Sequence, residues 1–367
     1  KILESLMFEV KAKGKNALSV TVPTWRSSKD INIEDDLVEE IARIYGYENI
    51  PASLPDLPTK LPEENTERFK KHRTRELLSY GLGFNEIYNY SFYSRNDFQK
   101  CLMTEAGHLK LLNYLSEDQT HMRTSLIPGL LKNICENVKN SDEVRVYEIG
   151  HVYKEIGKYF PLEEKEVVGV VAKKGKSENG FYEAKGAVEL FFERNGIKGA
   201  RMVKGVKNVP YAHPYKSVSY IHGDGQTLAK IFMLHPIVLK NFDLEKYKIA
   251  VFEINFSESV KLMNAEKLYK QIPKFPGVEI DIAVVMDKKM EVAEVEKVIK
   301  KADIILIRDV KLFDVYEGES IGKDKKSVAF KISFLADDRT LSGDEVAKIT
   351  TEIFQDLKKL DCSLRGE

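Results

Sequence analysis

The densest group of residues able to do chemistry lies near the N-terminus. Three acids and a base recur there at spacings of three and four residues: Asp36, Glu39, Glu40 and Arg43. This spacing places them on one face of a helix. Asp30 lies six residues before Asp36 and could fold back over the helix start. Clustered carboxylates repel one another unless they are neutralised, and Mg²⁺, which takes oxygen ligands, would neutralise them.

A second interpretation of this acidic face stays open. Acids in the first turn of a helix interact favourably with the helix dipole, and Glu39 can pair with Arg43 one turn later. On that interpretation the acids form a solvated surface and bind no metal. The spacing alone does not separate the two.

The rest of the chain contains no catalytic constellation. Gly81-Leu-Gly83 is followed by no Lys or Ser/Thr at phosphate-loop spacing and indicates a helix end. His213 and His235 each precede a proline and have no ligand-spaced neighbour, which indicates turn or packing roles. Ser125 lacks the GxSxG context of a nucleophile. We therefore predict no catalytic residue in this chain.

Basic residues gather near the C-terminus and could contact phosphates. The candidate RNA-binding residues are Lys311, Lys323, Lys325, Lys326 and Arg339. Residues 274–367 hold 17 Lys and Arg against 20 Asp and Glu. An RNA-binding role there requires a segregated basic face, and a solvated hairpin tip is the alternative.

The composition is that of an ordinary globular protein, with 43% hydrophobic and 31% charged residues. The 57 basic and 57 acidic residues balance, so charge favours no nucleic-acid partner, and we expect neither DNA nor a membrane. Three widely separated cysteines suit a reducing, cytoplasmic location. The chain begins without Met, in what reads as the middle of a helix, so we expect a fragment.

Prolines divide the chain into three predicted domains, 1–51, 62–262 and 274–367. Pro51, Pro55, Pro58 and Pro62 make an extended linker, since proline lacks an amide donor and restricts its predecessor. A second break falls at Pro273 and Pro276. Long runs of strands with inserted helices favour a mostly antiparallel α+β middle domain.

The first and last domains give the clearest element predictions. A helix is expected over 34–47, with Leu37, Ile41 and Ile44 as its buried stripe. In the middle domain, 86–92 is expected as a strand. The last domain reads as βαββαβ, a ferredoxin-like order, and Ser342 to Glu345 forms a capping box at its second helix.

Three stretches, in order, resemble the phenylalanyl-tRNA synthetase beta subunit family. The first is VPTWR at 22–26, followed by Asp30 and by DLVEEIARIYGY at 36–47. The resemblance implies that the family's magnesium ligands map onto Asp30, Asp36, Glu39 and Glu40. The inserted Ser27, Ser28 and Lys29 depart from the family pattern just before Asp30.

The second and third stretches extend the resemblance over nearly the whole chain. MRTSLIPGLL at 122–131 and YEIG at 147–150 resemble the family's catalytic-like module, a class II synthetase fold without a working active site. No GxGxGxxR segment for ATP is present, and Tyr215 and Lys216 depart from the family's small residues. LFDVYEG at 312–318 and RTL at 339–341 resemble the ferredoxin-fold anticodon-binding domain.

The resemblance implies a non-catalytic subunit of phenylalanine–tRNA ligase. Two beta subunits would join two alpha subunits in a heterotetramer, with ATP-dependent aminoacylation of tRNA(Phe) carried out by alpha. This chain would bind Mg²⁺, pack on alpha and position the tRNA. Two alternatives stay open: a self-contained magnesium-dependent ligase and a scaffold that binds only protein. A single-chain synthetase is disfavoured by the missing catalytic motifs.

Overall fold

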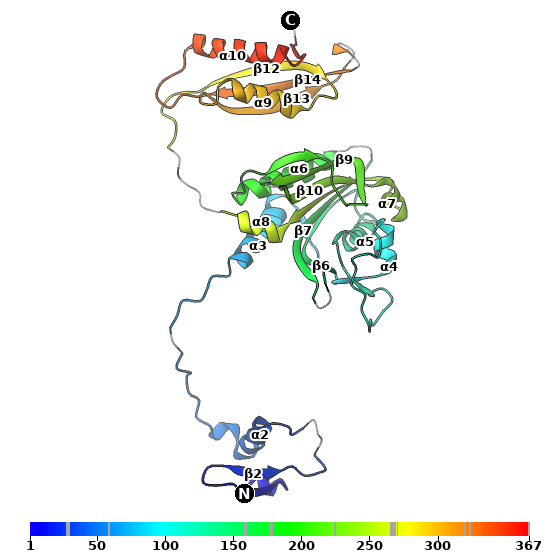
Figure 1. Cartoon of the computed structure of the whole chain (residues 1–367), viewed down its shortest axis with the longest axis vertical. Coiled ribbons are helices and arrows are strands. Elements are labelled where there is room, and N and C mark those ends of the chain that lie inside the picture. Colours follow the sequence, from blue (N-terminus) through cyan, green and yellow to red (C-terminus); the bar gives the residue numbers. More distant parts are fainter. Residues whose placement is uncertain are drawn as a thin grey trace.

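The computed structural model has three folded parts, and an extended segment joins the first to the second (Figure 1). The structure describes residues 1–26, 30–57, 59–157, 160–175, 179–223, 225–264, 269, 271–318, 321–322 and 324–365. Proline-rich residues 51–57 and 59–64 contain no helix or strand, as the sequence predicts. Within the described residues, no helix combines the length and the apolar character needed to cross a bilayer.

The N-terminal part pairs a small antiparallel sheet with one main helix. Its elements are α1 (Ile2–Ser5), β1 (Glu9–Ala12), β2 (Leu18–Thr21), α2 (Glu34–Tyr45) and the 3-10 turn η1 (Tyr47–Asn49). Helix α2 stops at Gly46, whose φ of +93° is readily reached only without a side chain. The helix prediction over 34–47 is therefore confirmed.

The predicted buried stripe of α2 is wrong. Leu37 is half-buried, whereas Ile41 and Ile44 keep 39% and 45% of their surface exposed. The buried residue of this helix is Glu40, at 8%. The apolar face is present, as the spacing indicates, but the described residues cover it only in part.

The middle part is built on a seven-stranded sheet in the order β3-β6-β7-β11-β10-β9-β8. Its strands are β3 (Asn85–Glu86), β6 (Glu143–Lys154), β7 (Leu162–Lys174), β8 (Arg201–Lys204), β9 (Ala212–His222), β10 (Gln226–Leu234) and β11 (Tyr247–Asn255). All neighbours are antiparallel except β3 and β6. The predicted mostly antiparallel α+β organisation is confirmed.

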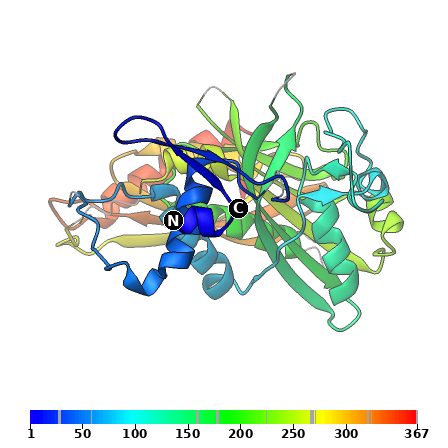
Figure 2. The ribbon, with the colours of Figure 1, turned by 90° about the horizontal axis from the view of Figure 1, so that it is seen from below.

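Helices cover both faces of this sheet. The remaining elements are α3 (Thr66–Glu76) with the π-helical turn η2 (Leu77–Gly81), β4 (Phe92–Tyr93), α4 (Arg95–Lys100), β5 (His121–Met122), α5 (Ile127–Asn137), α6 (Asn179–Arg194), α7 (Pro236–Asn241) and α8 (Phe256–Leu262). Val170 and Val251 pack toward α5, while Val171 and Phe252 pack toward α6. Figure 2 shows α5, in teal, beside the green strands.

The predicted strand over 86–92 is wrong for most of its length. Only β3 and β4 form at its two ends, and β4 pairs with β5 outside the main sheet. Between them, the Arg123 guanidinium donates to the carbonyls of Asn89 and Tyr90 at 3.3 and 3.4 Å. These carbonyls are satisfied by a side chain, so no neighbouring strand is required there.

The C-terminal part has the predicted βαββαβ order. Its elements are β12 (Val278–Asp287), α9 (Val292–Ala302), β13 (Ile307–Tyr316), β14 (Lys325–Phe334), α10 (Gly343–Lys358) and β15 (Ser363–Leu364). The strands lie in the order β13-β14-β12-β15. Phe330 and Ile332 pack with Ile299 of α9 and Ile353 of α10, so both helices cover one face of the sheet. The opposite face carries alternate residues such as Lys331.

Candidate functional site

The predicted metal ligands lie around the start of α2. Asp36 accepts hydrogen bonds from the backbone amides of Asn32 and Ile33 at 2.6 and 2.9 Å. These donors favour the ionised form and lower the pKa of Asp36. The carboxylate therefore caps the helix and is held against its own backbone.

Arg26 occupies the space between two of the other acids. Its Nε donates to Asp30 Oδ2 at 2.5 Å, and its Nη1 and Nη2 donate to the two Glu40 oxygens at 3.3 and 3.2 Å. Arg43 also donates to Glu40 Oε2 at 2.9 Å. The hydrogen bonds from Arg26, followed by those from Arg43, lower the pKa of Glu40. The two arginines thus neutralise the buried acid.

This arrangement does not fit a divalent cation as it stands. One carboxylate oxygen of Asp30, one of Asp36 and both of Glu40 accept hydrogen bonds from protein donors. Glu39 is exposed and makes no hydrogen bond or ion pair with a described residue. Across the ranges that the structure describes, no three His, Cys, Asp or Glu side chains gather closely enough to hold a metal ion. The magnesium site stays a prediction; the inserted residues 27–29 lie outside the described residues.

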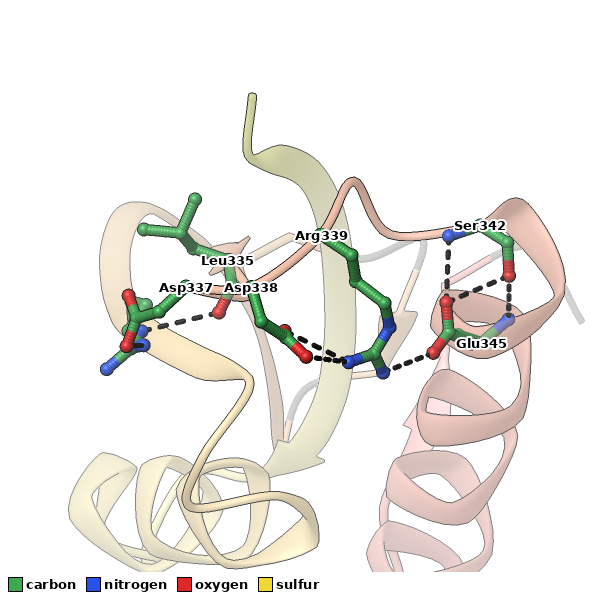
Figure 3. Close-up of polar contacts among 7 residues, drawn as sticks. Leu335, Asp337, Asp338, Arg339, Ser342 and Glu345 are labelled. Atoms are coloured by element: carbon green, nitrogen blue, oxygen red, sulfur yellow. Dashed lines mark hydrogen bonds and ion pairs between the residues drawn. The ribbon is translucent and has the colours of Figure 1, made fainter. Parts of the chain in front are cut away.

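The predicted RNA-binding residues fall into two groups, and the first is engaged within the protein. Arg339 donates to Asp338 at 3.1 Å and to Glu345 at 2.7 Å (Figure 3). Lys326 is half-buried and its Nζ donates to the carbonyls of Lys288 and Met290 at 3.1 and 2.7 Å. Both side chains would have to leave these partners to contact a phosphate.

The second group is available at the surface. Lys311 and Lys325 are exposed and make no ion pair with a described residue, while Lys323 lies outside the described residues. Lys311 lies on β13 directly opposite Lys331 of β14, on the sheet face that the helices leave open. Lys331 is paired with Glu279 and Asp281, so Lys311 carries the uncompensated charge of this pair.

The sequence analysis missed the aromatic residues of the same edge strand. Phe313 and Tyr316 of β13 are 51% and 38% exposed, and the Arg365 guanidinium lies 4.6 Å from the centre of the Tyr316 ring. An edge strand with exposed aromatic rings beside lysine offers stacking and charge together. The run LFDVY contains the signal, because its apolar residues do not alternate cleanly as those of a half-buried strand do.

The other residues singled out from the sequence have structural roles. His213 Nδ1 accepts from the amides of Tyr215 and Lys216 at 3.2 and 3.3 Å, and His235 Nδ1 accepts from the amide of Ile237 at 3.1 Å. These are turn histidines, as predicted. Gly83 has a φ of +69° just after the helical turn η2, which agrees with a helix end.

A buried ion pair anchors the α5 side of the middle sheet. Arg123 Nη1 donates to Glu148 Oε1 at 2.6 Å, and both side chains are almost fully buried. Asn89 also donates to Glu148, at 2.7 Å. The Arg123 Nε and Nη1 groups and the Asn89 amide all donate to protein acceptors, so the cluster organises the module.

Three family models match the chain, in order. Residues 1–47 match the tRNA synthetase B5 domain, residues 50–256 the phenylalanyl tRNA synthetase beta chain CLM domain, and residues 273–365 the ferredoxin-fold anticodon binding domain. The second match alone covers more than half of the chain.

Curated relatives match along almost the whole sequence. A phenylalanine–tRNA ligase beta subunit of Listeria monocytogenes is 33% identical, over 98% of this chain and 45% of the relative. One of Bacillus licheniformis is 34% identical, over 100% of this chain and 46% of the relative. The chain spans about half the length of the curated relatives it matches.

Solved structures give a weaker likeness. A Giardia lamblia prolyl-tRNA synthetase in complex with prolyl-adenylate aligns with a TM-score of 0.46 at 10% identity, covering 53% of this chain and 45% of that chain. A pyrrolysyl-tRNA synthetase from Desulfitobacterium hafniense aligns with a TM-score of 0.44 at 17% identity, covering 53% and 68%. Likeness at this level carries no argument about the present chain.

Proposed function

We propose that this chain is a non-catalytic part of phenylalanine–tRNA ligase. The premise is that the chain belongs to the phenylalanyl-tRNA synthetase beta chain family. It would position tRNA(Phe) and assemble with the alpha subunit, in the cytoplasm. The observation that carries the proposal is the C-terminal sheet. One face is covered by α9 and α10, while the edge strand β13 carries Lys311 on the open face and also two exposed aromatic rings, Phe313 and Tyr316.

The proposed division of labour follows three domains, residues 1–51, 62–262 and 274–367. The last would contact the tRNA anticodon region, in keeping with the family model that matches 273–365. The middle domain, a class II synthetase-like module, would pack on the alpha subunit in an α2β2 heterotetramer. Its exposed side chains Tyr88, Tyr90, Leu112 and Leu115 would make that contact, since large apolar surface is typical of interfaces.

A binding experiment on the assembled enzyme tests the RNA contact. Fluorescence anisotropy with labelled tRNA(Phe) would be recorded for the wild type and for Lys311→Ala over a range of salt concentrations. We expect weaker binding and a salt slope lower by about one, because one phosphate contact is lost. Lys348→Ala is the control, since Lys348 is an exposed lysine on α10, on the covered side of the sheet. Equal behaviour of the two variants would contradict the proposed RNA face.

Catalysis by this chain itself is the rival proposal, and ATP–pyrophosphate exchange separates the two. The chain would be assayed alone and with a bacterial alpha subunit, in the presence of phenylalanine. We expect exchange only with alpha, because no described part of the chain combines a nucleotide cradle with a general base. Exchange by the chain alone would establish the self-contained ligase. Complex formation with alpha but no tRNA binding would favour the protein-only scaffold.

Magnesium binding by Asp30, Asp36, Glu39 and Glu40 stays outside this proposal. The hydrogen bonds from Arg26 and from the backbone supply the compensation that a cation would otherwise provide. The competition between Arg26 and Mg²⁺ is open to a direct test, described below.

A further inference from the structure

A cavity of about 670 Å³ opens at one end of the middle sheet. Six charged residues line it. Glu155 and Lys207 are exposed and Lys154 belongs to β6, while the other three are Glu166 of β7, Lys230 of β10 and Glu253 of β11. The register places them on one face, because Lys230 lies opposite Glu253, and Glu166 lies opposite Asn255, two residues further along. Further along the same face, Val168 and Val251 are buried in the core. The residues on this face of β7 and β11 are therefore valines in the core and glutamates at the cavity.

Two of the three acids at this end of the sheet have partners. Glu253 accepts from the Tyr211 hydroxyl at 2.7 Å and lies 3.5 Å from the Lys230 ammonium. Glu164 is paired with Lys154 at 2.5 Å. Each of these carboxylates is thus matched by one lysine.

Glu166 is the acid without a match. It is half-buried beside the other two and makes no hydrogen bond or ion pair with a described residue. Burial and the nearby Glu253 raise the pKa of Glu166 to about 8, although Lys230 and Lys154 oppose the shift. The exposed lining residues Glu155 and Lys207 carry opposite charges, so one negative charge remains at the cavity when the Glu166 carboxyl group is ionised.

The remaining lining suits a small organic molecule. Hydroxyls of Thr124, Ser125 and Tyr211 line the cavity, together with apolar side chains of Met103 and Ile156. A volume of this size lies within the range of small-molecule sites. A divalent cation fits less well. It would place two positive charges beside the Lys230 ammonium, whereas only one carboxylate of these strands, that of Glu166, lacks a partner among the described residues.

We propose that this cavity binds a small molecule bearing a protonated primary amine, whose ammonium group pairs with Glu166. An alkylammonium carries the single positive charge that the site lacks and three donors for carboxylate oxygens. Its carbon chain contacts Met103 and Ile156, and the hydroxyls accept or donate to polar groups of the ligand.

Binding of the cation is coupled to loss of a proton from Glu166. Near pH 7 this carboxyl group is mostly neutral, and the ligand binds its ionised form. The groups that face it are Glu253, Lys230, Lys154, Glu164 and Tyr211. Affinity for an alkylammonium therefore rises roughly tenfold between about pH 7 and about pH 9, where an alkylamine, like lysine, is still protonated.

Methyl NMR of the full chain tests this with n-butylammonium chloride as the probe and n-butanol as its uncharged counterpart. The methyl groups of Met103 and Ile156 report on the cavity, and Met202, outside its lining, is the reference. We expect saturable shifts at Met103 and Ile156 with the ammonium, stronger at higher pH, and none with butanol. No saturable shift up to pH 9, or equal shifts with butanol, would overturn the proposal.

Two substitutions assign the binding to Glu166. Glu166→Gln should weaken butylammonium binding at least tenfold and remove its pH dependence, while Glu163→Gln, an exposed acid on the same strand, should leave both unchanged. Lys230→Met should strengthen binding, since it removes a competing ammonium. Unchanged affinity in a folded Glu166→Gln protein would overturn the assignment. If Glu166→Gln does not fold, the Lys230→Met variant decides. Weaker or unchanged butylammonium binding by Lys230→Met would then overturn the assignment to Glu166.

Discussion

Helices α2 and α10 begin alike and are held in place by different forces. Each has an acid three residues after its N-cap, Asp36 in α2 and Glu345 in α10, whose carboxylate accepts the N-cap backbone amide. Beyond this first turn they differ. α10 packs Ile353 fully out of solvent against its sheet, whereas α2 leaves Ile41 and Ile44 exposed and buries Glu40.

The difference shows that an apolar stripe is a property of a helix and its burial is a property of what lies beside it. α10 finds a sheet with matching apolar residues, so the hydrophobic effect holds it. α2 contacts α1, and the pairing of Glu40 with Arg26 ties it to the segment that precedes it. The first kind of attachment should depend on side-chain volume and the second on charge.

The largest expected effect comes from truncating the two stripes. Ile353→Ala should destabilise the C-terminal part by about 2–5 kcal/mol, because it removes packed atoms from a closed core. Ile41→Ala should cost less, about 1 kcal/mol, since 39% of its surface is already exposed and fewer packed atoms are lost. Amide hydrogen exchange of the two helices measures both. An equal loss in the two would mean that the stripe of α2 is covered in solution.

The next effect comes from removing the charge that holds α2. Arg26→Gln leaves Asp30 and Glu40 without their shared donor, so α2 amides should exchange several-fold faster while α10 is unchanged. Lys15→Gln, at an exposed lysine of the same part, is the matched control.

The same variant tests the magnesium prediction. In the wild type, millimolar MgCl₂ should protect α2 no more than KCl of equal ionic strength, because Arg26 already bridges the acids. In Arg26→Gln, MgCl₂ should restore part of the protection. Specific protection of the wild type by Mg²⁺ would show that the cation displaces Arg26 and would support the predicted ligands.

Local patterns were enough to predict the C-terminal part. Its βαββαβ order and the capping box from Ser342 to Glu345 follow from short-range spacing that the structure confirms. The neighbours in sequence here are also neighbours in space. Arg26 and Glu40, fourteen residues apart, meet only because the chain folds back, and no spacing rule indicates that pairing.

The cavity at Glu166 was equally out of reach of the sequence. Glu163, Glu164, Lys165 and Glu166 form a charged run before the valines of β7, which favours a solvated strand end. Only the register of three strands brings Lys230 and Glu253 beside Glu166. The segment 87–91 could not be predicted for the same reason, because its backbone carbonyls accept hydrogen bonds from Arg123, which is distant in sequence.

A smaller effect should come from the caps. In α10, Ser342 Oγ accepts the Glu345 amide at 3.3 Å and Glu345 accepts the Ser342 amide at 3.0 Å, so the capping box is complete. In α2 the N-cap is Ile33, which has no side-chain acceptor. Ser342→Ala should cost about 1 kcal/mol, and Ile33→Ser should stabilise α2 by about 0.5–1 kcal/mol, since Ile33 is exposed and has an extended backbone. Thermal unfolding that moves both variants in the same direction would contradict this.

The smallest effect is the loss of stability of the α10 cap at low pH, when the Glu345 carboxylate becomes protonated. Hydrogen bonds from Arg339, followed by those from Ser342, lower the pKa of Glu345 from 4.5 to about 2. A depressed folded-state pKa means that the contribution to stability is complete above the unfolded value and is lost as pH falls from about 4.5 through about 2. Carbon NMR of the Glu345 carboxyl group measures this titration directly.

Arg339→Gln gives that titration its control and connects it to RNA binding. Without the guanidinium, the pKa of Glu345 should rise toward its ordinary value, though Ser342 still donates to it. If tRNA recruits Arg339 to a phosphate, as the sequence predicts, the RNA-bound wild type should show the same rise. If the Glu345 titration is the same with and without tRNA, Arg339 is a structural partner of the cap, and Lys311 and Lys325 are left to contact the phosphates.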